Sequence, residues 1–224
     1  MTPAELTGQA RSHVVEVAEL GVALHREVVA PFIAMRQMAL AAGIDLLPAS
    51  AFRDFARQLA IWNGKYAGHR PTVGADGAPL DVTRLAPVER VAAILRWSAL
   101  PGASRHHWGT DLDLYDRGAV APEVGPRLDP AEYAEGGRFA RASAWLEQHA
   151  AHFGFFRPYR GRRSGVQGEP WHYSFAPVAH RASRAFDVAT LRDALAAAPL
   201  AGKEAVLGAL DTIYARYVAR IDLF

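Results

Sequence analysis

Residues 104–115 read SRHHWGTDLDLY, and this stretch contains the most informative pattern of the chain. In its second half the acidic Asp111 and Asp113 alternate with the apolar Leu112 and Leu114. A period of two is typical of a β-strand, because successive side chains of a strand point to opposite faces. We therefore predict a strand here, with two carboxylates on one face of a buried sheet.

Outward from this strand, the chain predicts helices and short strands without a regular βαβ alternation. In the first helix Pro31 is expected to break or restart the helix, and Gly43 is well placed to end it. The expected helices are 13–42, 53–66, 87–97 and 138–153, with two more within 190–218 that separate near 199–202, and the expected strands are 44–49, 108–115 and 171–175. The pattern indicates an α+β fold: a small, mostly antiparallel sheet flanked by helices, with extra C-terminal helices.

Composition excludes several classes of function. Of 224 residues, 50% are hydrophobic and 21% are charged, which is the balance of a folded protein and favours one domain over residues 1–224. The net charge of +2 is scattered, so no basic stripe for nucleic acid is visible. Without cysteine there is no disulfide, thiolate zinc site or cysteine nucleophile. Lysine occurs only at positions 65 and 203, outside any P-loop pattern.

No apolar run approaches the ~20 residues that cross a bilayer, so we expect no membrane span. The start, MTPAELTGQARSHVVEVAEL, has acidic residues where a signal peptide has a basic and then an apolar stretch. As written, the sequence carries no export signal and indicates a cytoplasmic protein. A trimmed form of a protein from the bacterial periplasm or cell envelope would look the same.

Two segments supply the side chains that a hydrolytic zinc site needs. Such a site has about three His, Asp or Glu ligands, an open position for water, and a further carboxylate that accepts the water's proton. His106 and Asp113 come from the first segment, and Glu169 and His172 come from EPWH at residues 169–172. We predict one zinc ion bound by His106, Asp113 and His172, with Glu169 as the base.

The spacing S-x-H-x-x-G-x-x-x-D, followed by E-x-W-H, resembles the zinc D-Ala-D-Ala carboxypeptidases of the VanY type, which are peptidoglycan peptidases with a small α+β fold. Further matches are SAFR at 50–53 followed by Gln58, and FGF at 153–155 before GEPWH at 168–172. The resemblance implies a zinc peptidase core at about 28–178 and leaves 187–224 as a helical C-terminal extension.

This resemblance implies zinc-dependent hydrolysis of the C-terminal peptide bond of peptidoglycan peptides, with D-alanyl-D-alanine as the first candidate. The substrate-binding residues that it implies are Arg53, Gln58 and Ser104. Asp111 stands where the family usually has a small residue, so it would crowd the metal, bind it in place of Asp113, or accept a hydrogen bond from a ligand imidazole. Ala51 and Phe52 replace Gly-Tyr, which removes a phenol from the substrate side.

Arg53 has a physical argument of its own. If Ser50 caps the following helix, Arg53 falls in its first turn, where the helix dipole disfavours a cation by roughly 0.3 to 1 kcal/mol. A terminal carboxylate of a peptide is a suitable partner, because a guanidinium binds it through two hydrogen bonds. The alternative is a solvated arginine whose charge is balanced by the neighbouring Asp54. With the resemblance, we predict that Arg53 acts in catalysis by binding the substrate.

Other functions use the same residues. An L,D-carboxypeptidase or a peptidoglycan endopeptidase would have the same zinc site, although Arg53 favours cleavage at a free C-terminus. A noncatalytic, zinc-stabilised binding module is the alternative from another class, and Glu169 argues against it because such a module needs no base. His107 is expected near the site without binding the metal, whereas His149 and His152 are expected on a solvated helix face.

Overall fold

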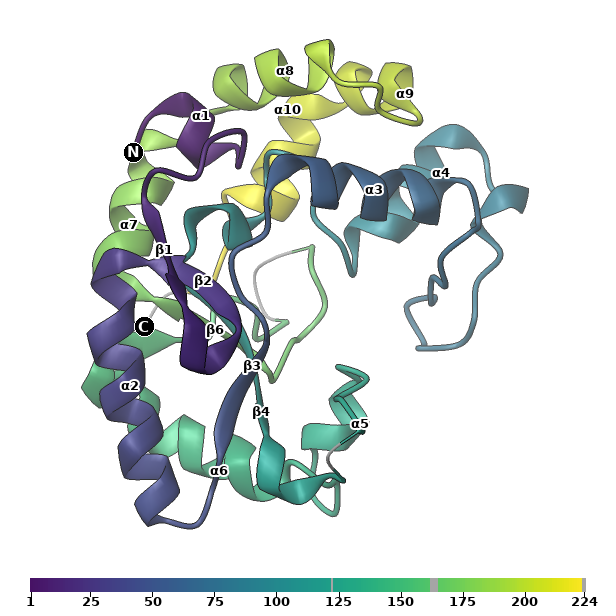
Figure 1. Ribbon diagram of the computed structural model, residues 1–224. Coiled ribbons are helices and arrows are strands. Elements are labelled where there is room, and N and C mark those ends of the chain that lie inside the picture. Colours follow the sequence, from purple (N-terminus) through teal and green to yellow (C-terminus); the bar gives the residue numbers. More distant parts are fainter. Residues whose placement is uncertain (122, 162–164, 223–224) are drawn as a thin grey trace.

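The computed structural model describes residues 1–121, 123–161 and 165–222. It confirms the α+β fold, with a small antiparallel sheet, flanking helices and further helices at the C-terminal end (Figure 1). No helix in these ranges is both long and apolar enough to cross a membrane.

A four-stranded antiparallel sheet lies at the centre of the fold. Its strands, in spatial order, are β3 (Leu46–Ser50), β4 (Asp111–Asp116), β6 (His172–Phe175) and β5 (Phe155–Phe156). In this register Asp113 lies opposite His172 on one side and opposite Ser50 on the other. Three segments that are distant in sequence therefore meet at one level of the middle strand.

The strand predicted over 108–115 begins only at Asp111. Residues Arg105–Trp108 form a 3₁₀ turn (η3), which ends at Gly109 with φ 67°. A Cβ at Gly109 would lie 2.7 Å from the backbone nitrogen of His25, whose N–H donates to the Gly109 carbonyl. A glycine is required here both for the left-handed backbone and for this close approach.

The predicted helix over 13–42 is wrong in its first half. Strands β1 (Val14–Val17) and β2 (Val22–His25) form an antiparallel hairpin there, and helix α2 (Arg26–Ala41) follows. Valines favour the extended chain, since their branched side chains are restricted in a helix. Pro31 lies inside α2 without ending it, because the helix buries an apolar face that includes Val28, Phe32, Met35 and Ala39.

The other predicted helices form within a few residues of their expected bounds. They are α3 (Phe55–Tyr66), α4 (Pro87–Leu95) and α6 (Ala140–His149), the last extended by a 3₁₀ turn, η5 (Ala150–Phe153). Three short or unexpected helices join them: α1 (Pro3–Leu6), α5 (Pro130–Tyr133) in a stretch that reads as a loop, and α7 (Ala176–Ala185) directly after β6.

Two apolar cores flank the level of the site. One packs α2 and α6 against the sheet and contains Phe32, Leu112, Leu114, Leu146 and Phe155. The other lies among α3, α4, α7 and the C-terminal helices and contains Trp62, Ile94, Ala179, Leu195 and Leu210. Figure 1 shows α2 and α6 at one end of the molecule, α3, α4 and the C-terminal helices at the other, and α7 along the side between them. Leu112 and Leu114 enter the first core, so Asp111 and Asp113 face the other side of β4.

The C-terminal extension forms α8 (Val188–Ala197), α9 (Lys203–Gly208), α10 (Leu210–Ile213) and a π-helical turn at Tyr214–Val218. The predicted interruption near 199–202 is present. It docks on α3, where Trp62 Nε1 donates to the Ala201 carbonyl at 3.0 Å and Asn63 binds the backbone of Pro199 and Ala201. These contacts join the extension to the helices that surround the site.

Candidate active site

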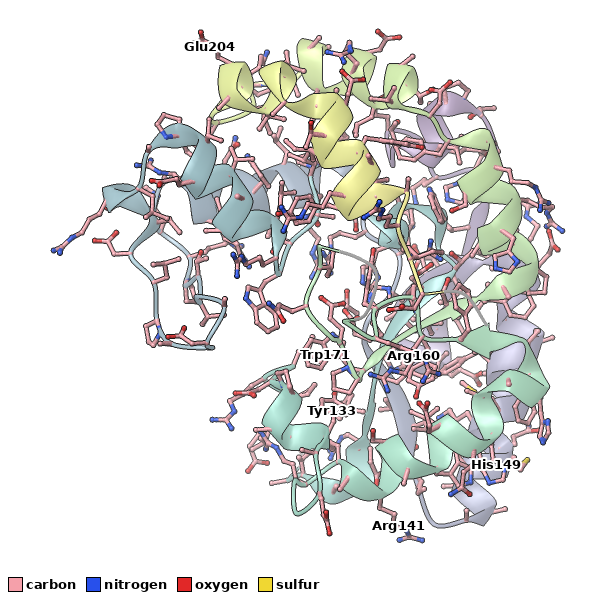
Figure 2. The ribbon with its side chains drawn as sticks, turned by 180° about the vertical axis from the view of Figure 1, so that it is seen from behind. Tyr133, Arg141, His149, Arg160, Trp171 and Glu204 are labelled. Carbon is pink, nitrogen blue, oxygen red and sulfur yellow. The ribbon has the colours of Figure 1, made fainter. Side chains whose placement is uncertain are left out.

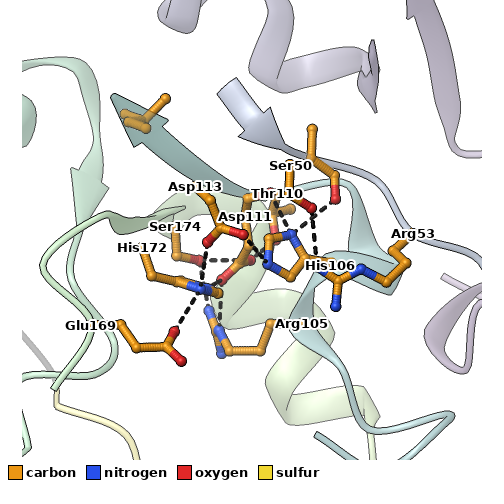
Figure 3. Close-up of polar contacts among 12 residues, drawn as sticks. Ser50, Arg53, Arg105, His106, Thr110, Asp111, Asp113, Glu169, His172 and Ser174 are labelled. Atoms are coloured by element: carbon orange, nitrogen blue, oxygen red, sulfur yellow. Dashed lines mark hydrogen bonds and ion pairs between the residues drawn. The ribbon is translucent and has the colours of Figure 1, made fainter. Parts of the chain in front are cut away.

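His106, Asp113 and His172 form one buried cluster (Figure 3). One potential ligand atom from each residue lies within 4.8 Å of the others. Turn η3 supplies His106, and the paired strands β4 and β6 supply Asp113 and His172. The structure therefore brings together the three side chains that the sequence predicts as metal ligands.

Backbone contacts orient the His106 ring. Its Nδ1 lies 2.9 Å from the Ala51 carbonyl oxygen and 3.1 Å from that of Asp111, so Nδ1 carries the proton and donates it. The other ring nitrogen, Nε2, lies 3.3 Å from Asp113 Oδ2. This tautomer leaves the Nε2 lone pair free toward the cluster, as a metal ligand requires.

The ring of His172 is oriented by Asp111. His172 Nε2 lies 2.9 Å from Asp111 Oδ1, and Nδ1 lies 3.2 Å from Asp113 Oδ1 and 3.1 Å from Glu169 Oε2. Donation from Nε2 to Asp111 leaves the Nδ1 lone pair directed at the cluster. Of the three roles considered for Asp111, this geometry supports the third, in which Asp111 accepts a hydrogen bond from a ligand imidazole and thereby orients it.

Asp111 has further partners that hold it away from the cluster. Arg105 Nε donates to Oδ1 at 2.8 Å, and the hydroxyls of Thr110 and Ser174 donate to Oδ2. Burial opposes ionisation, but Arg105 and the hydrogen bonds from His172 and Thr110 hold the pKa of Asp111 well below its usual range. The Arg105 guanidinium in turn stacks over Trp108, 4.8 Å from the ring centroid. Asp111 is thus a fixed, fully paired carboxylate.

The cluster requires a positive charge. Burial disfavours the charged form of His172, but the carboxylates of Asp111, Asp113 and Glu169 hold its pKa well above the usual value. Asp113 Oδ1 is buried without a hydrogen-bond donor. A cation among these atoms satisfies both observations, and two imidazole nitrogens with one carboxylate form a donor set that suits zinc. The residues present therefore fit the predicted metal.

Glu169 lies at the edge of the cluster. A turn holds it, in which its N–H donates to the Tyr159 carbonyl at 3.0 Å and its own carbonyl accepts from the His172 N–H at 3.3 Å. The Tyr159 ring packs edge-on against His172, with 5.0 Å between the ring centroids. Glu169 is only partly buried and lines the pocket, so its carboxylate faces both the cluster and the cavity.

Arg53 lies beside the cluster, but Ser50 does not cap the following helix. Asp54 does, by accepting from the Arg57 N–H at 2.7 Å, so Arg53 precedes the helix. The Arg53 guanidinium donates to Ser50 Oγ at 3.0 Å and to Gln58 Oε1 at 2.8 Å. Burial lowers the pKa of Arg53, and the charges of Asp113 and Glu169 oppose this shift. Because Arg53 lies outside the helix, the argument from the helix dipole for a bound anion fails. The partly desolvated charge of the Arg53 guanidinium still supports a bound anion.

Gln58 does not contact the pocket. It is fully buried, accepts from Arg53 and donates from Nε2 to the Ala99 carbonyl at 2.7 Å. Its place supports a role in holding Arg53 rather than the expected substrate contact. Ser104 does line the pocket, at the residue before η3, so its substrate-binding role stays a prediction.

His107 is directed away from the metal cluster. Its Nδ1 donates to the Arg53 carbonyl, its Nε2 accepts from the Gly102 N–H at 3.0 Å, and burial lowers its pKa to about 3. A neutral His107 therefore fixes the backbone of Arg53. His149, the last residue of α6, is half-buried rather than solvated and stacks on Trp145 with 4.8 Å between ring centroids; Figure 2 shows it far from Trp171 at the site.

A pocket of about 460 Å³ opens in front of the cluster. Its strand side consists of His106, Asp113, Glu169 and His172, carried by β4, β6 and the turns that lead into them. Its helix side includes Arg53, Lys65, Ser98, Tyr217 and Val218, which come from the residues before α3, from α3, from the segment after α4 and from the C-terminal extension. Sequence reasoning missed Lys65, Ser98, Tyr159 and the contribution of the extension. The scarcity of lysine was the one signal for Lys65.

Comparisons with known proteins show the family of the chain. The family model "VanY: D-alanyl-D-alanine carboxypeptidase" matches residues 21–178. An uncharacterized protein of Haemophilus influenzae is 34% identical over 121 residues, which cover 53% of this chain and 92% of that protein. A D-alanyl-D-alanine carboxypeptidase of Enterococcus faecalis is 27% identical over 143 residues, 62% of this chain but only 43% of the relative.

Two solved structures share the fold. VanYB in complex with D-alanine-D-alanine has a TM-score of 0.56 and 21% identity, covering 79% of this chain and 83% of that one. A mutant of the vancomycin resistance D,D-pentapeptidase VanY in complex with Zn(II) has a TM-score of 0.56 and 20% identity, covering 88% of this chain and 91% of that one. Because the sequence identity to these two structures is 21% and 20%, their structural similarity shows a shared fold alone.

Proposed function

The chain belongs to the VanY family of D-alanyl-D-alanine carboxypeptidases, and we propose that it is a zinc-dependent peptidase that removes the last residue of peptidoglycan peptides ending in D-alanyl-D-alanine. The observation that carries the proposal is the position of Glu169, whose Oε2 lies 3.1 Å from His172 Nδ1 while its carboxylate lines the pocket. This position supports Glu169 as the base, because it lies beside the point toward which the two imidazoles and Asp113 direct their free electron pairs.

Each side chain has a role in this reaction. A bound zinc ion would polarise the scissile carbonyl and acidify the attacking water. Glu169 would take a proton from that water at its carboxylate and then hand it to the leaving amine. Asp111 and the Ala51 carbonyl keep His172 and His106 in the tautomers that face the cluster. Arg53, held by Ser50 and Gln58, would bind the terminal carboxylate of the peptide.

Metal analysis combined with peptide hydrolysis tests the proposal. Purified protein would be assayed for zinc and then offered peptides that end in a D,D or an L,D bond, together with a cross-linked peptide. We expect about one zinc per chain and release of D-alanine from the D,D peptides, lost on chelation and restored by zinc. Cleavage of only the L,D or cross-linked peptides would reassign the substrate, and bound zinc without any hydrolysis would support a binding module.

A further inference from the structure

Lys65 is a further cation in the pocket wall, besides Arg53, Arg105 and Arg127. It lies in the last turn of α3 and is partly buried, and its Nζ donates to Ser98 Oγ at 2.7 Å. Both residues line the pocket. In the part of the chain that the structure describes, no carboxylate lies within ion-pair distance of this ammonium. Lys65 has therefore lost part of its hydration and has only a neutral hydroxyl in return.

The surrounding charges leave Lys65 without a counter-ion of its own. Burial lowers its pKa, the charges of Arg53 and Arg70 lower it further, and only Glu169 acts in the opposite direction. Glu169 is already engaged with His172 at 3.1 Å. An anion that enters the pocket would thus gain more at Lys65 than at a solvated surface lysine.

A purely structural role explains Lys65 less well. A cation in the last turn of a helix is favoured by the dipole, and the bond to Ser98 ties α3 to the segment after α4. Neither effect needs the ammonium inside a cavity. Lys203, the other lysine of the chain, is partly buried and satisfies a backbone carbonyl, that of Ala196, without lining the pocket.

Arg53 and Lys65 lie at opposite ends of α3. Arg53 precedes Phe55, the first residue of the helix, and Lys65 is its penultimate residue. Ten residues of helix separate the backbones of Phe55 and Lys65 by about 15 Å along the axis, so the two cations enter the pocket from different ends of α3. The two cations are thus suited to different groups of one bound peptide.

We propose that Lys65 and Ser98 form a second anion subsite, which binds a side-chain carboxylate of the substrate peptide while Arg53 binds the terminal carboxylate. The inference rests on the proposed function and narrows its substrate class to peptides with an acidic residue upstream of the cleaved bond. Ser98 would turn its hydroxyl hydrogen toward the same carboxylate.

Paired peptides test the subsite. Pentapeptides ending in D-alanyl-D-alanine would carry one glutamate at the first, second or third position, each paired with a glutamine peptide. At one position wild type should prefer glutamate by roughly 10- to 100-fold in kcat/KM, mainly through KM, as for a hydrogen bond to a charged group. Lys65→Met should abolish that preference, Lys65→Arg should restore part of it, and Lys203→Met should keep it.

Two outcomes would overturn the subsite: equal cleavage of every glutamate and glutamine pair by wild type, or an equal loss on both peptides in Lys65→Met. The second would show that Lys65 acts on Glu169 or on the fold instead. A shift of the pH profile of kcat in Lys65→Met with both peptides would separate these two cases.

A direct readout keeps the test independent of turnover. Reductive ¹³C-methylation labels only Lys65, Lys203 and the amino terminus, because the chain has two lysines. In zinc-loaded Glu169→Gln protein, the favoured glutamate peptide should shift the Lys65 signal and leave the Lys203 signal in place, whereas the glutamine peptide should not. If wild type cleaves no peptide, the proposed function fails, and this spectrum, recorded with all three glutamate peptides, still decides the subsite: no Lys65 shift would refute it.

Discussion

The two sides of the pocket are built differently. On the strand side, buried groups from adjacent strands hold one another through short contacts, such as His172 with Asp111 at 2.9 Å. On the helix side, the long side chains of Arg53 and Lys65 reach into the cavity and are held mainly by neutral partners, Ser50, Gln58 and Ser98. The strand side is thus organised to hold a cation, and the helix side to receive anions.

This difference assigns chemistry to one side and substrate choice to the other. A change on the strand side should damage turnover whatever peptide is used. A change on the helix side should have an effect that depends on the charges of the peptide. The following predictions test this division, beginning with the largest effect.

Replacing any one of His106, Asp113 or His172 by alanine should reduce bound zinc from about one per chain to near zero and abolish hydrolysis, because two ligands do not offset the dehydration of the ion. Zinc content by elemental analysis and activity on a D,D peptide measure this. His149→Ala, at the end of α6 and far from the site, should keep both.

Chelation of wild type should also lower Tm by several degrees, since a ligand at 100 times its Kd stabilises the fold by about 2.7 kcal/mol. Full zinc in His172→Ala would refute the ligand set, and an unchanged Tm after verified removal of zinc would show that the metal does not stabilise the fold.

Glu169→Gln should fold and bind zinc but lose ~10² to 10⁴ of kcat, the range that a general base supplies. Steady-state kinetics with parallel zinc analysis measure this, and the loss should be similar for all cleavable peptides. The surface variant Glu147→Gln serves as the control, because the ion-pair partners of Glu147 among the described residues are Arg157 and Arg160. Normal turnover in Glu169→Gln would remove this residue from the mechanism.

Arg53→Ala should lower kcat/KM for peptides with a free C-terminus by about 2 to 5 kcal/mol, the cost of losing one partner of a buried charge pair. Amidation of the peptide should cause a similar loss in wild type. The two losses should not add, because each removes the same interaction.

The four combinations of wild type and Arg53→Ala with free and amidated peptides measure this coupling, with zinc content determined in parallel. Equal cleavage of free and amidated peptides by wild type would favour an endopeptidase.

Asp111→Asn should weaken zinc binding by about 10- to 100-fold while the protein stays folded, because it removes the charge that holds the His172 tautomer. Competition with a chelator of known affinity measures the change. Asp116→Asn is a matched control, since Asp116 ends the same strand and its donors, within the described ranges, are the Asp45 and Gly118 N–H groups. Complete loss of zinc in Asp111→Asn would instead indicate that Asp111 is a ligand.

Predictions from the sequence succeeded where local pattern and burial agreed. The alternation around Asp111 and Asp113 marked β4, and the helices near α3 and α4 formed close to their expected bounds. The pattern failed over Val14–His25, where apolar spacing suits a helix but branched side chains and Gly21 favour a hairpin. Ser50 was a plausible cap for this helix, yet the cap is Asp54, which directly precedes the first helical residue.

The sequence by itself determined the family, the α+β class and the set of four residues proposed for metal and base, because these depend on residue type and short spacing. Only the tertiary structure decided which atoms meet. Strand pairing placed Asp113 opposite His172, and Asp111 became a hydrogen-bond acceptor for His172. The pairing of Lys65 with Ser98 and the approach of Tyr217 to the pocket depend on how α3 docks against α4 and the extension. Such contacts join residues far apart in the chain, and local spacing does not encode them.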